Sequence, residues 1–197
     1  VPVPGRDIFV QAWYQGGISV IDFTDSYNPF EIAYFDRGPI LEDELITGGF
    51  WSAYYYQGTI YGTEITRGLD VLKLIPSKYL SENEIAAAAM AYPVIGPRRL
   101  FNPQHQVPMT WPAAPEVARA YIDQLMRDDA ISEDSAERIG DMLDQVTLAM
   151  ENGGDNRLAR QINSYRLSAK GSNISLTQHR LEKLDATLKG IAAGLRG

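Results

Sequence analysis

The chain has 197 residues, of which 45% are hydrophobic and 22% are charged, and its formal net charge is −7. This composition is typical of a globular protein, and the negative charge argues against a nucleic-acid groove or electrostatic docking on anionic lipid. The absence of cysteine excludes a disulfide scaffold, a thiol nucleophile and cysteine-based metal sites. Because the sequence begins with Val1 rather than methionine, we expect a processed, cleaved or incomplete chain, for which a removed export signal is one explanation.

Three β-strands are predicted in the first 35 residues. Period-two alternation puts Trp13 and Tyr14 on opposite faces of the first strand, with Tyr14 on the side of Ile8. A glycine pair forms a hairpin turn before the second strand. An Asx-Pro sequence ends that strand, because Asx side chains bond their own backbone and proline cannot donate to a ladder. The predicted strands are 7–14, 18–23 and 30–35.

Three further strands follow a loop or short helical turn at 37–49. Tyr54, Tyr55 and Tyr56 are consecutive, so their rings must point to both faces of one strand. One of these faces can be the core, and the other must meet something else. The predicted strands are 51–57, 59–65 and 69–75.

Two sequence repeats relate these sets of strands. Tyr14-Gln15-Gly16 recurs as Tyr56-Gln57-Gly58, a shift of 42, and segment 17–21 recurs as 68–72, a shift of 51. A repeat of about 40–50 residues that carries three or four strands is typical of a propeller blade. Because two units are too few to close a ring, we expect a fragment or a small open sheet, in a domain over 1–80.

The pattern changes at Ser81. Ser81 and Glu84 fit a capping box, which predicts a short helix that ends near Pro93. The six prolines in 93–115 predict an extended linker. The short helix and the linker together form the second segment, 81–114.

Four helices are predicted in 115–197 from apolar stripes at helical spacing. The first begins at Pro115, the second is capped at Ser132 and the third begins at Asp155. The last pairs Ser175 with Gln178, and Gly171 before it suits a left-handed cap. The predicted fold class is therefore α+β with segregated parts: a small antiparallel β unit of propeller-blade type followed by a helical bundle. The residues expected to be buried include Val117, Tyr121, Leu125, Ile139, Met142, Leu143, Val146, Met150, Leu158, Ile162, Tyr165, Leu181, Leu184, Leu188, Ile191 and Leu195.

Residues 18–29, ISVIDFTDSYNP, resemble the repeat of the LVIVD-repeat proteins, in which a strand is followed by an aspartate and an Asx-Pro stop. Segment 69–77 is a weaker copy that lacks the aspartate. Such proteins are typically exported bacterial β-propellers without an assigned reaction, so this resemblance implies export and provides no catalytic residue. The tail from about 116, with its NGGDNRLARQINSY turn, resembles the FIMAH-type helical module that is appended to secreted bacterial proteins.

Few groups suit catalysis or metal binding. His105 and His179 are the two histidines, whereas a mononuclear zinc site usually needs two or three His or Cys ligands. The sequence has no G-x-S-x-G elbow and no phosphate-binding glycine loop. We therefore predict no catalytic residue, no cofactor and no metal ligand, and hence no enzyme.

Acidic residues leave two alternatives open. Asp22, Asp25 and Asn28 lie at a strand end, and 42–44 is an acidic run, Glu42-Asp43-Glu44. Calcium takes such oxygen ligands, but the spacing lacks the EF-hand order, so turn formation is favoured. A glycosidase would need two acids held across a cleft, which makes a hydrolase the third functional alternative.

Aromatic residues are concentrated in the two β segments and predict an interface. Tyr and Trp combine a large apolar area with a polar tip, and they are enriched where proteins bind each other. Packing between blades accounts for about half of them, and a partner protein for the rest. The candidates are Trp13, Tyr14, Trp51, Tyr54, Tyr55 and Tyr56.

These observations predict a non-enzymatic, membrane-extrinsic scaffold subunit on the periplasmic side of a larger bacterial membrane complex. Its partners would be other protein subunits, with no nucleic acid and no membrane span of its own, since no stretch approaches 18 apolar residues. A photosynthetic reaction-centre and light-harvesting assembly is one specific candidate. The alternative is a remnant of a secreted propeller that binds a surface ligand such as a glycan.

Overall fold

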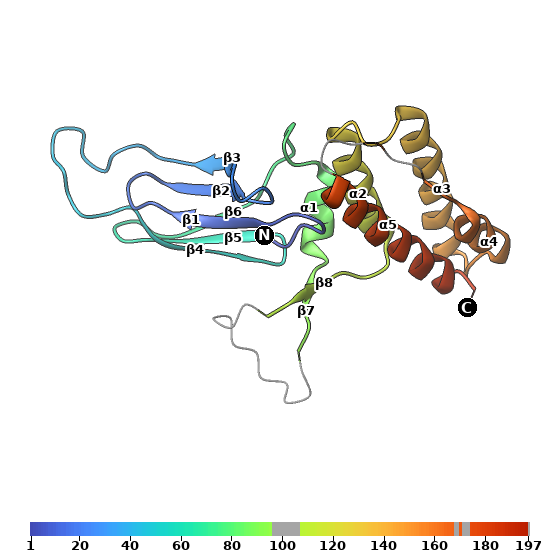
Figure 1. Ribbon diagram of the computed structural model, residues 1–197. Coiled ribbons are helices and arrows are strands. Elements are labelled where there is room, and N and C mark those ends of the chain that lie inside the picture. Colours follow the sequence, from blue (N-terminus) through green and yellow to red (C-terminus); the bar gives the residue numbers. More distant parts are fainter. Residues whose placement is uncertain (96–106, 168–169, 171–173, 197) are drawn as a thin grey trace. The chain divides into compact units, whose positions relative to one another are not determined.

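The computed structural model describes residues 1–95, 107–167, 170 and 174–196, which divide into two compact units (Figure 1). Among these residues, the first unit, Val1–Ala91, holds two three-stranded antiparallel sheets and a short helix. The second unit, Tyr92–Gly197, holds a two-stranded ribbon and four helices. The α+β class predicted from the sequence is therefore confirmed.

The first sheet has the strand order β1-β2-β3. Strand β1 (Ile8–Ala12) pairs antiparallel with β2 (Ile18–Asp22), which pairs antiparallel with β3 (Phe30–Phe35). A bulge between Val20 and Ile21 shifts the register of β2 against β3. The buried positions of β2 and β3 include the β-branched residues that predicted these strands.

The second sheet has the strand order β4-β5-β6. Strand β4 (Phe50–Tyr56) pairs antiparallel with β5 (Thr59–Glu64), which pairs antiparallel with β6 (Gly68–Leu72). The register shifts between Phe50 and Ser52, so the intervening tryptophan has no opposite residue on β5. Such a bulge re-aims the side chain of the extra residue.

The two sheets lie face to face as two layers (Figure 1). A Cβ atom added to Gly62 on β5 would lie 2.7 Å from Cδ1 of Ile18 on β2, so glycine is what allows the sheets to approach here. Half-buried side chains such as Tyr55 and Leu72 pack around the shared core. The buried members of this core are Val3, Ile8, Val20, Ile32, Ile60, Leu80 and Ala88.

Helix α1 (Glu82–Ala89) belongs to the first unit. The prediction from the sequence had placed this helix with the linker, in segment 81–114. The Ser81 side chain accepts a hydrogen bond from the Glu84 amide, and the Glu84 carboxylate accepts one from the Ser81 amide at 2.8 Å. The predicted capping box is therefore confirmed. Ala88 on this helix lies in the shared core, so α1 is held by packing as well as by its cap.

Strands β7 (Tyr92–Pro93) and β8 (Met109–Thr110) form a short antiparallel ribbon at the start of the second unit. The sequence predicted an extended linker over 93–115. The ribbon shows that two parts of this segment pair with each other, and the Val94 amide donates to the Pro108 carbonyl at 2.8 Å. His105 lies outside the described residues.

Four helices form a bundle in the second unit. Both α2 (Pro115–Arg127) and α4 (Asn156–Ser164) contact α3 (Glu133–Glu151) and α5 (Ile174–Gly194). Their predicted apolar stripes supply most of the core, as amphipathic helices require. The buried residues include Val117, Tyr121, Leu125, Ile139, Met142, Leu143, Val146, Leu158, Ile162, Leu184, Leu188, Ile191 and Leu195.

Three of the four helices in the second unit begin where the sequence predicted. Pro115 is the first residue of α2, and Ser132 and Asp155 cap α3 and α4 with their side chains. Ser175 lies inside α5 rather than before it, so that predicted cap is wrong. Met150 is half exposed and was wrongly expected in the core, because it lies in the last turn of α3 beyond the buried stripe. Tyr165 is half-buried at the end of α4, Leu181 is half-buried, and Gly171 lies outside the described residues.

Candidate functional site

The two sheets are joined at one end by a backbone bridge between Tyr14 and Phe50. The Tyr14 amide donates to the Phe50 carbonyl at 3.1 Å, and the Phe50 amide donates to the Tyr14 carbonyl at 2.8 Å. Tyr14 has a φ of 54°, in the left-handed region that costs a non-glycine residue about 1–3 kcal/mol. This conformation ends the alternation of β1, so the prediction that Tyr14 continues the face of Ile8 is wrong.

The ring of Tyr14 contacts the ring of Trp51, and we call these two residues the junction pair. Their ring centroids are 5.9 Å apart, and their planes are inclined by 86°. Such edge-to-face contacts contribute about 0.5–1.5 kcal/mol beyond area burial. Tyr14 nevertheless remains 52% exposed and Trp51, the bulge residue of β4, remains 68% exposed. The pair therefore joins one aromatic side chain from each sheet in a fixed arrangement that faces solvent.

The other four aromatic candidates lie on the sheet faces. Trp13 is half exposed and donates its indole N–H to the Ser19 hydroxyl at 2.9 Å. Tyr54 and Tyr56 are exposed, whereas Tyr55 packs against the shared core, so the three tyrosines reach both faces as predicted. Only Tyr55 among the six candidates packs against the core, which is fewer than the half expected to be internal. The remaining candidates divide between the junction and the outer faces of the two sheets.

A buried ion-pair network in the first unit was not predicted from the sequence. Arg6 Nε donates to Asp22 Oδ2 at 2.9 Å, and Arg6 Nη1 donates to Glu84 Oε1 and to the Tyr79 carbonyl, both at 2.8 Å. All three charged side chains are buried. Asp22 is the aspartate of the LVIVD-like segment, so its role here is to bind the arginine. No local signal identifies this network, because Arg6 and Glu84 are 78 residues apart.

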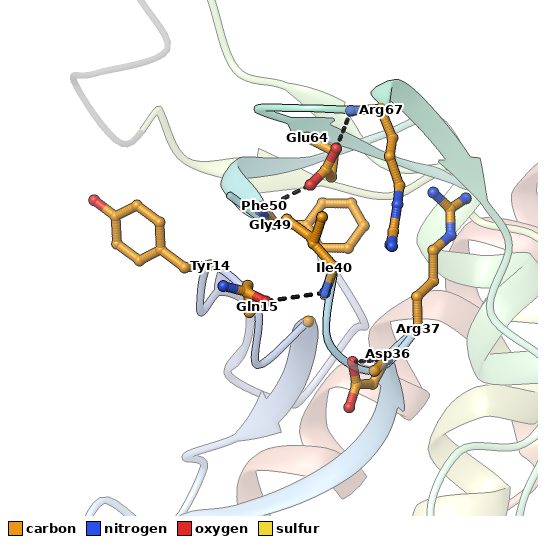
Figure 2. A pocket seen from close by; sticks show the side chains of 11 residues that line it. Tyr14, Gln15, Asp36, Arg37, Ile40, Gly49, Phe50, Glu64 and Arg67 are labelled. Carbon is orange, nitrogen blue, oxygen red and sulfur yellow. Dashed lines mark hydrogen bonds between the residues drawn. The ribbon is translucent and has the colours of Figure 1, made fainter. Parts of the chain in front are cut away.

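Glu64, at the end of β5, is a second buried carboxylate. It accepts hydrogen bonds from the Gly49 amide at 2.7 Å and from the Arg67 amide (Figure 2). It also accepts one from the Thr66 amide at 2.9 Å. These bonds fix the turn after β5 and tie it to the residue before β4. Glu64 therefore organises the end of the second sheet next to the junction.

The 42-residue repeat could have identified Glu64 from the sequence, because it relates Glu64 to another carboxylate at a strand end. A shift of 42 places Asp22 on Glu64 and Thr24 on Thr66. In both sheets the carboxylate at the end of the central strand accepts from the amide two residues later, at 2.8 Å in the first sheet and 2.9 Å in the second. The repeat thus carries a turn device as well as a strand pattern.

Both carboxylates should stabilise the first unit in a pH-dependent way. Burial raises the pKa of Asp22, but hydrogen bonds from Thr24 and the charge of Arg6 outweigh burial and hold this pKa below its usual range. Burial also raises the pKa of Glu64. The backbone and side-chain hydrogen bonds that Glu64 accepts outweigh burial and lower its pKa overall. The unfolded values are about 3.9 for Asp and 4.3 for Glu. A lowered folded pKa gives stability that is present above these values and is lost as pH falls through the folded pKa.

We expect the Glu64→Gln variant to be less stable than the parent at neutral pH and to lose less stability between about pH 5 and 3. The amide cannot accept every hydrogen bond that the carboxylate accepts, and it takes up no proton in acid. Urea denaturation at several pH values measures both effects. Glu42→Gln removes an exposed carboxylate and should keep the parent's pH dependence. Equal acid slopes for the parent and Glu64→Gln would contradict the assigned role.

A small cavity lies beside the bridge, lined in part by Tyr14, Gln15 and Glu64 (Figure 2). Its volume is about 10 Å³, far below the roughly 300–1,000 Å³ of typical small-molecule sites. The Gln15 side-chain amide donates to the Ile46 carbonyl at 2.6 Å and its oxygen accepts from the Ile40 amide at 3.1 Å. The polar groups of this wall therefore hold the loop before β4 in place and leave little to bind a ligand.

The candidate metal ligands have other partners or stand exposed. Asp25 accepts hydrogen bonds from the Tyr27 amide at 3.1 Å and from the Asn28 side chain at 2.8 Å, which is the geometry of an Asx turn. The acidic run 42–44 and His179 are exposed. Within the part of the chain that the structure describes, no three His, Asp or Glu side chains are grouped so that they could hold a metal ion.

No protein-family model matches the chain, and searches of curated proteins and of solved structures gave no match. In the described ranges, no helix combines the length and the apolar character needed to cross a bilayer. The resemblances to LVIVD-repeat and FIMAH-type proteins stay predictions. Function is therefore inferred from the chain's own surfaces.

Proposed function

We propose that the chain is a non-enzymatic scaffold subunit that binds a partner protein through the junction pair. The observation that carries this proposal is that Tyr14 and Trp51 are exposed and yet held in place, by the backbone bridge and by their mutual ring contact. Tyr and Trp are the residues most enriched among those that dominate binding energy. Side chains that are already fixed lose less conformational entropy when a partner binds.

The partner we propose is a membrane-bound protein complex met from the periplasmic side of a bacterial membrane. The support is the absence of cysteine, together with the LVIVD-like and FIMAH-like segments, which are typical of exported bacterial proteins. A photosynthetic reaction-centre and light-harvesting assembly is one complex to test. The helical bundle would provide a second contact, and two tethered contacts bind more tightly than either alone.

A glycan-binding role is the alternative, and one feature favours it. On the outer face of the first sheet, the Trp13 indole donates to the Ser19 hydroxyl, which donates to the Glu31 carboxylate at 2.5 Å. An exposed aromatic ring would stack on a sugar ring, and a carboxylate beside it would accept hydrogen bonds from the sugar hydroxyls. A glycan-binding protein would show saturable sugar binding in the absence of any partner protein. A hydrolase receives less support, because the buried Asp22 and Glu64 are fully engaged in structural bonds.

Replacing Trp51 by alanine is expected to weaken partner binding by about 1–3 kcal/mol, which is the usual cost of losing an interface anchor. The stability of the fold should change little, because this side chain is mostly exposed. Tagged parent and variant chains are used to recover partners from solubilised membranes, and the recovered proteins are quantified by mass spectrometry. Tyr27→Ala, which removes a 93% exposed tyrosine from a turn, is the control. Undiminished recovery with the double variant Tyr14→Ala, Trp51→Ala would refute the role of the pair.

A further inference from the structure

The hairpin β1–β2 recurs as the hairpin β5–β6, 51 residues later and in the same register. Adding 51 to both members of the pair Val10↔Val20 gives Tyr61↔Val71, which is an observed pair of β5 and β6. The register agrees along the strands, segment 17–21 resembles 68–72, and the equivalent turn glycines Gly17 and Gly68 have φ values of 83° and 94°, so the two hairpins are structural copies. The same shift relates Phe9↔Ile21 to Ile60↔Leu72, Gln11↔Ser19 to Gly62↔Asp70, and Ala12↔Ile18 to Thr63↔Leu69.

The 51-residue shift relates the buried face of the first hairpin to an exposed face of the second hairpin. Ile18 and Val20 are each 2% exposed, and Ile18 lies opposite Gly62 of the second sheet. Their equivalents, Leu69 and Val71, are 59% and 60% exposed. We call this side the front of each sheet.

The opposite side, the back, shows the reverse. Ile60 on the back of the second sheet is 3% exposed and belongs to the shared core, whereas its equivalent Phe9 on the back of the first sheet is 37% exposed. The two sheets therefore stack front to back. Within the chain, the front of the first sheet packs on the back of the second sheet. The front of the second sheet and the back of the first sheet remain exposed to solvent.

We propose that the exposed front of the second sheet stacks on the exposed back of the first sheet of another copy of this chain. Repeat units bury their faces by stacking on one another, so each terminal unit keeps one uncovered face. Such a face has the shape that receives a further unit. The contact within the chain shows that a front and a back of this kind pack together where a glycine lies on the back. The large side chains on the front are Tyr54, Tyr56, Tyr61, Leu69 and Val71, and those on the back include Phe9, Phe23 and Tyr34.

The composition of both faces suits a protein contact. The five large front residues carry no charge, and the rings of Phe9 and Phe23 on the back contact each other with centroids 5.3 Å apart. Glu31 on the back is hydrogen-bonded to Ser19. Aromatic enrichment and depletion of charge at the centre distinguish interface cores from ordinary surface.

This contact is heterologous, because two different faces meet, so it extends to a ring or a filament instead of stopping at a dimer. Gln11 occupies the position on the back of the first sheet that Gly62 occupies on the back of the second. Gly62 allows the close approach of Ile18, and the longer Gln11 side chain keeps the copies further apart. We therefore expect an association that is reversible and depends on concentration, and that does not require the junction pair.

Two variants of the full chain block one face each. Val71→Arg places a charge on the front, and Tyr34→Arg places one on the back, at positions that are exposed in the β unit. In analytical ultracentrifugation the parent should associate with rising concentration, and each variant alone should associate at least about tenfold more weakly. An equimolar mixture should form a dimer and nothing larger, because only one intact front and one intact back remain to meet. Leu45→Arg, in the exposed loop before β4, is the charge-matched control and should behave as the parent does.

The proposal is overturned by a parent chain that stays monomeric over the whole concentration range. It is equally overturned by a mixture that stays monomeric, or by a single variant that associates as strongly as the parent. Circular dichroism checks that the variants keep their strands. If Val71→Arg loses them, Leu69→Arg blocks the same front at another exposed position and is held to the same outcomes.

Discussion

Replacing Arg6 by methionine is expected to lower the free energy of unfolding of the first unit by about 3–5 kcal/mol. The guanidinium binds Asp22 and Glu84 at once, and the side chains of these carboxylates are only 7% and 0% exposed. Without the arginine, two carboxylates would remain in the interior without their countercharge. Removing one partner of a buried charge network is far more costly than removing an exposed charge.

Chemical denaturation of the Arg6→Met variant, with hydrogen exchange of the β2 amides, measures this loss. Arg67→Met is the control in the same unit, because the Arg67 side chain is exposed, and it should change stability by less than about 0.5 kcal/mol. In a double-mutant cycle with Asp22→Asn, the two losses should fall short of additivity, because both variants break the same contact. A loss below about 1 kcal/mol for Arg6→Met would show that the network does not hold the unit together.

The Gly17→Ala variant should lose about 3 kcal/mol, since two costs combine at this residue. Gly17 has a φ of 83°, which is unfavourable for alanine. An added Cβ would also clash with the carbonyl oxygen of Phe35 on β3 and lie 3.1 Å from Cα of Asp36. Backbone atoms cannot move aside as the end of a flexible side chain can.

Gly68 provides the matched control, because it is the equivalent of Gly17 in the 51-residue repeat. Its φ is 94°, but nothing lies within 4 Å of an added Cβ, so Gly68→Ala should cost only about 1 kcal/mol. The difference arises because β3 runs beside Gly17, whereas no strand of the described chain pairs with the outer edge of β6. Thermal denaturation of the two variants compares these costs. Equal losses would mean that the contact with β3 does not limit the size of the residue at position 17.

Features that depend on residues close in sequence could be predicted. Alternation located all six strands of the first unit, and Ser81 with Glu84 located the start of α1. Pro115, Ser132 and Asp155 located the starts of α2, α3 and α4 within a residue, and apolar spacing located their buried faces. These signals are local because a strand or a helical turn is specified by side chains two to four residues apart.

Features that depend on distant residues could not be predicted. Arg6 meets a partner 78 residues away, and nothing near it in the sequence marks it as buried. The left-handed conformation of Tyr14 depends on its bridge to Phe50, which lies on the other sheet. Five of the six aromatic candidates are exposed, and their role at an interface stays a prediction. Their division among the junction, two faces and the core follows from a bulge and a bridge. The sequence pattern shows neither of these.

The scaffold role is tested most directly by isolating the chain from detergent-solubilised native membranes and quantifying every protein that migrates with it. We expect a membrane protein at a constant ratio to the chain, and we expect this protein to be lost when both Tyr14 and Trp51 are replaced by alanine. A chain that migrates alone, or only with copies of itself, would contradict the scaffold role.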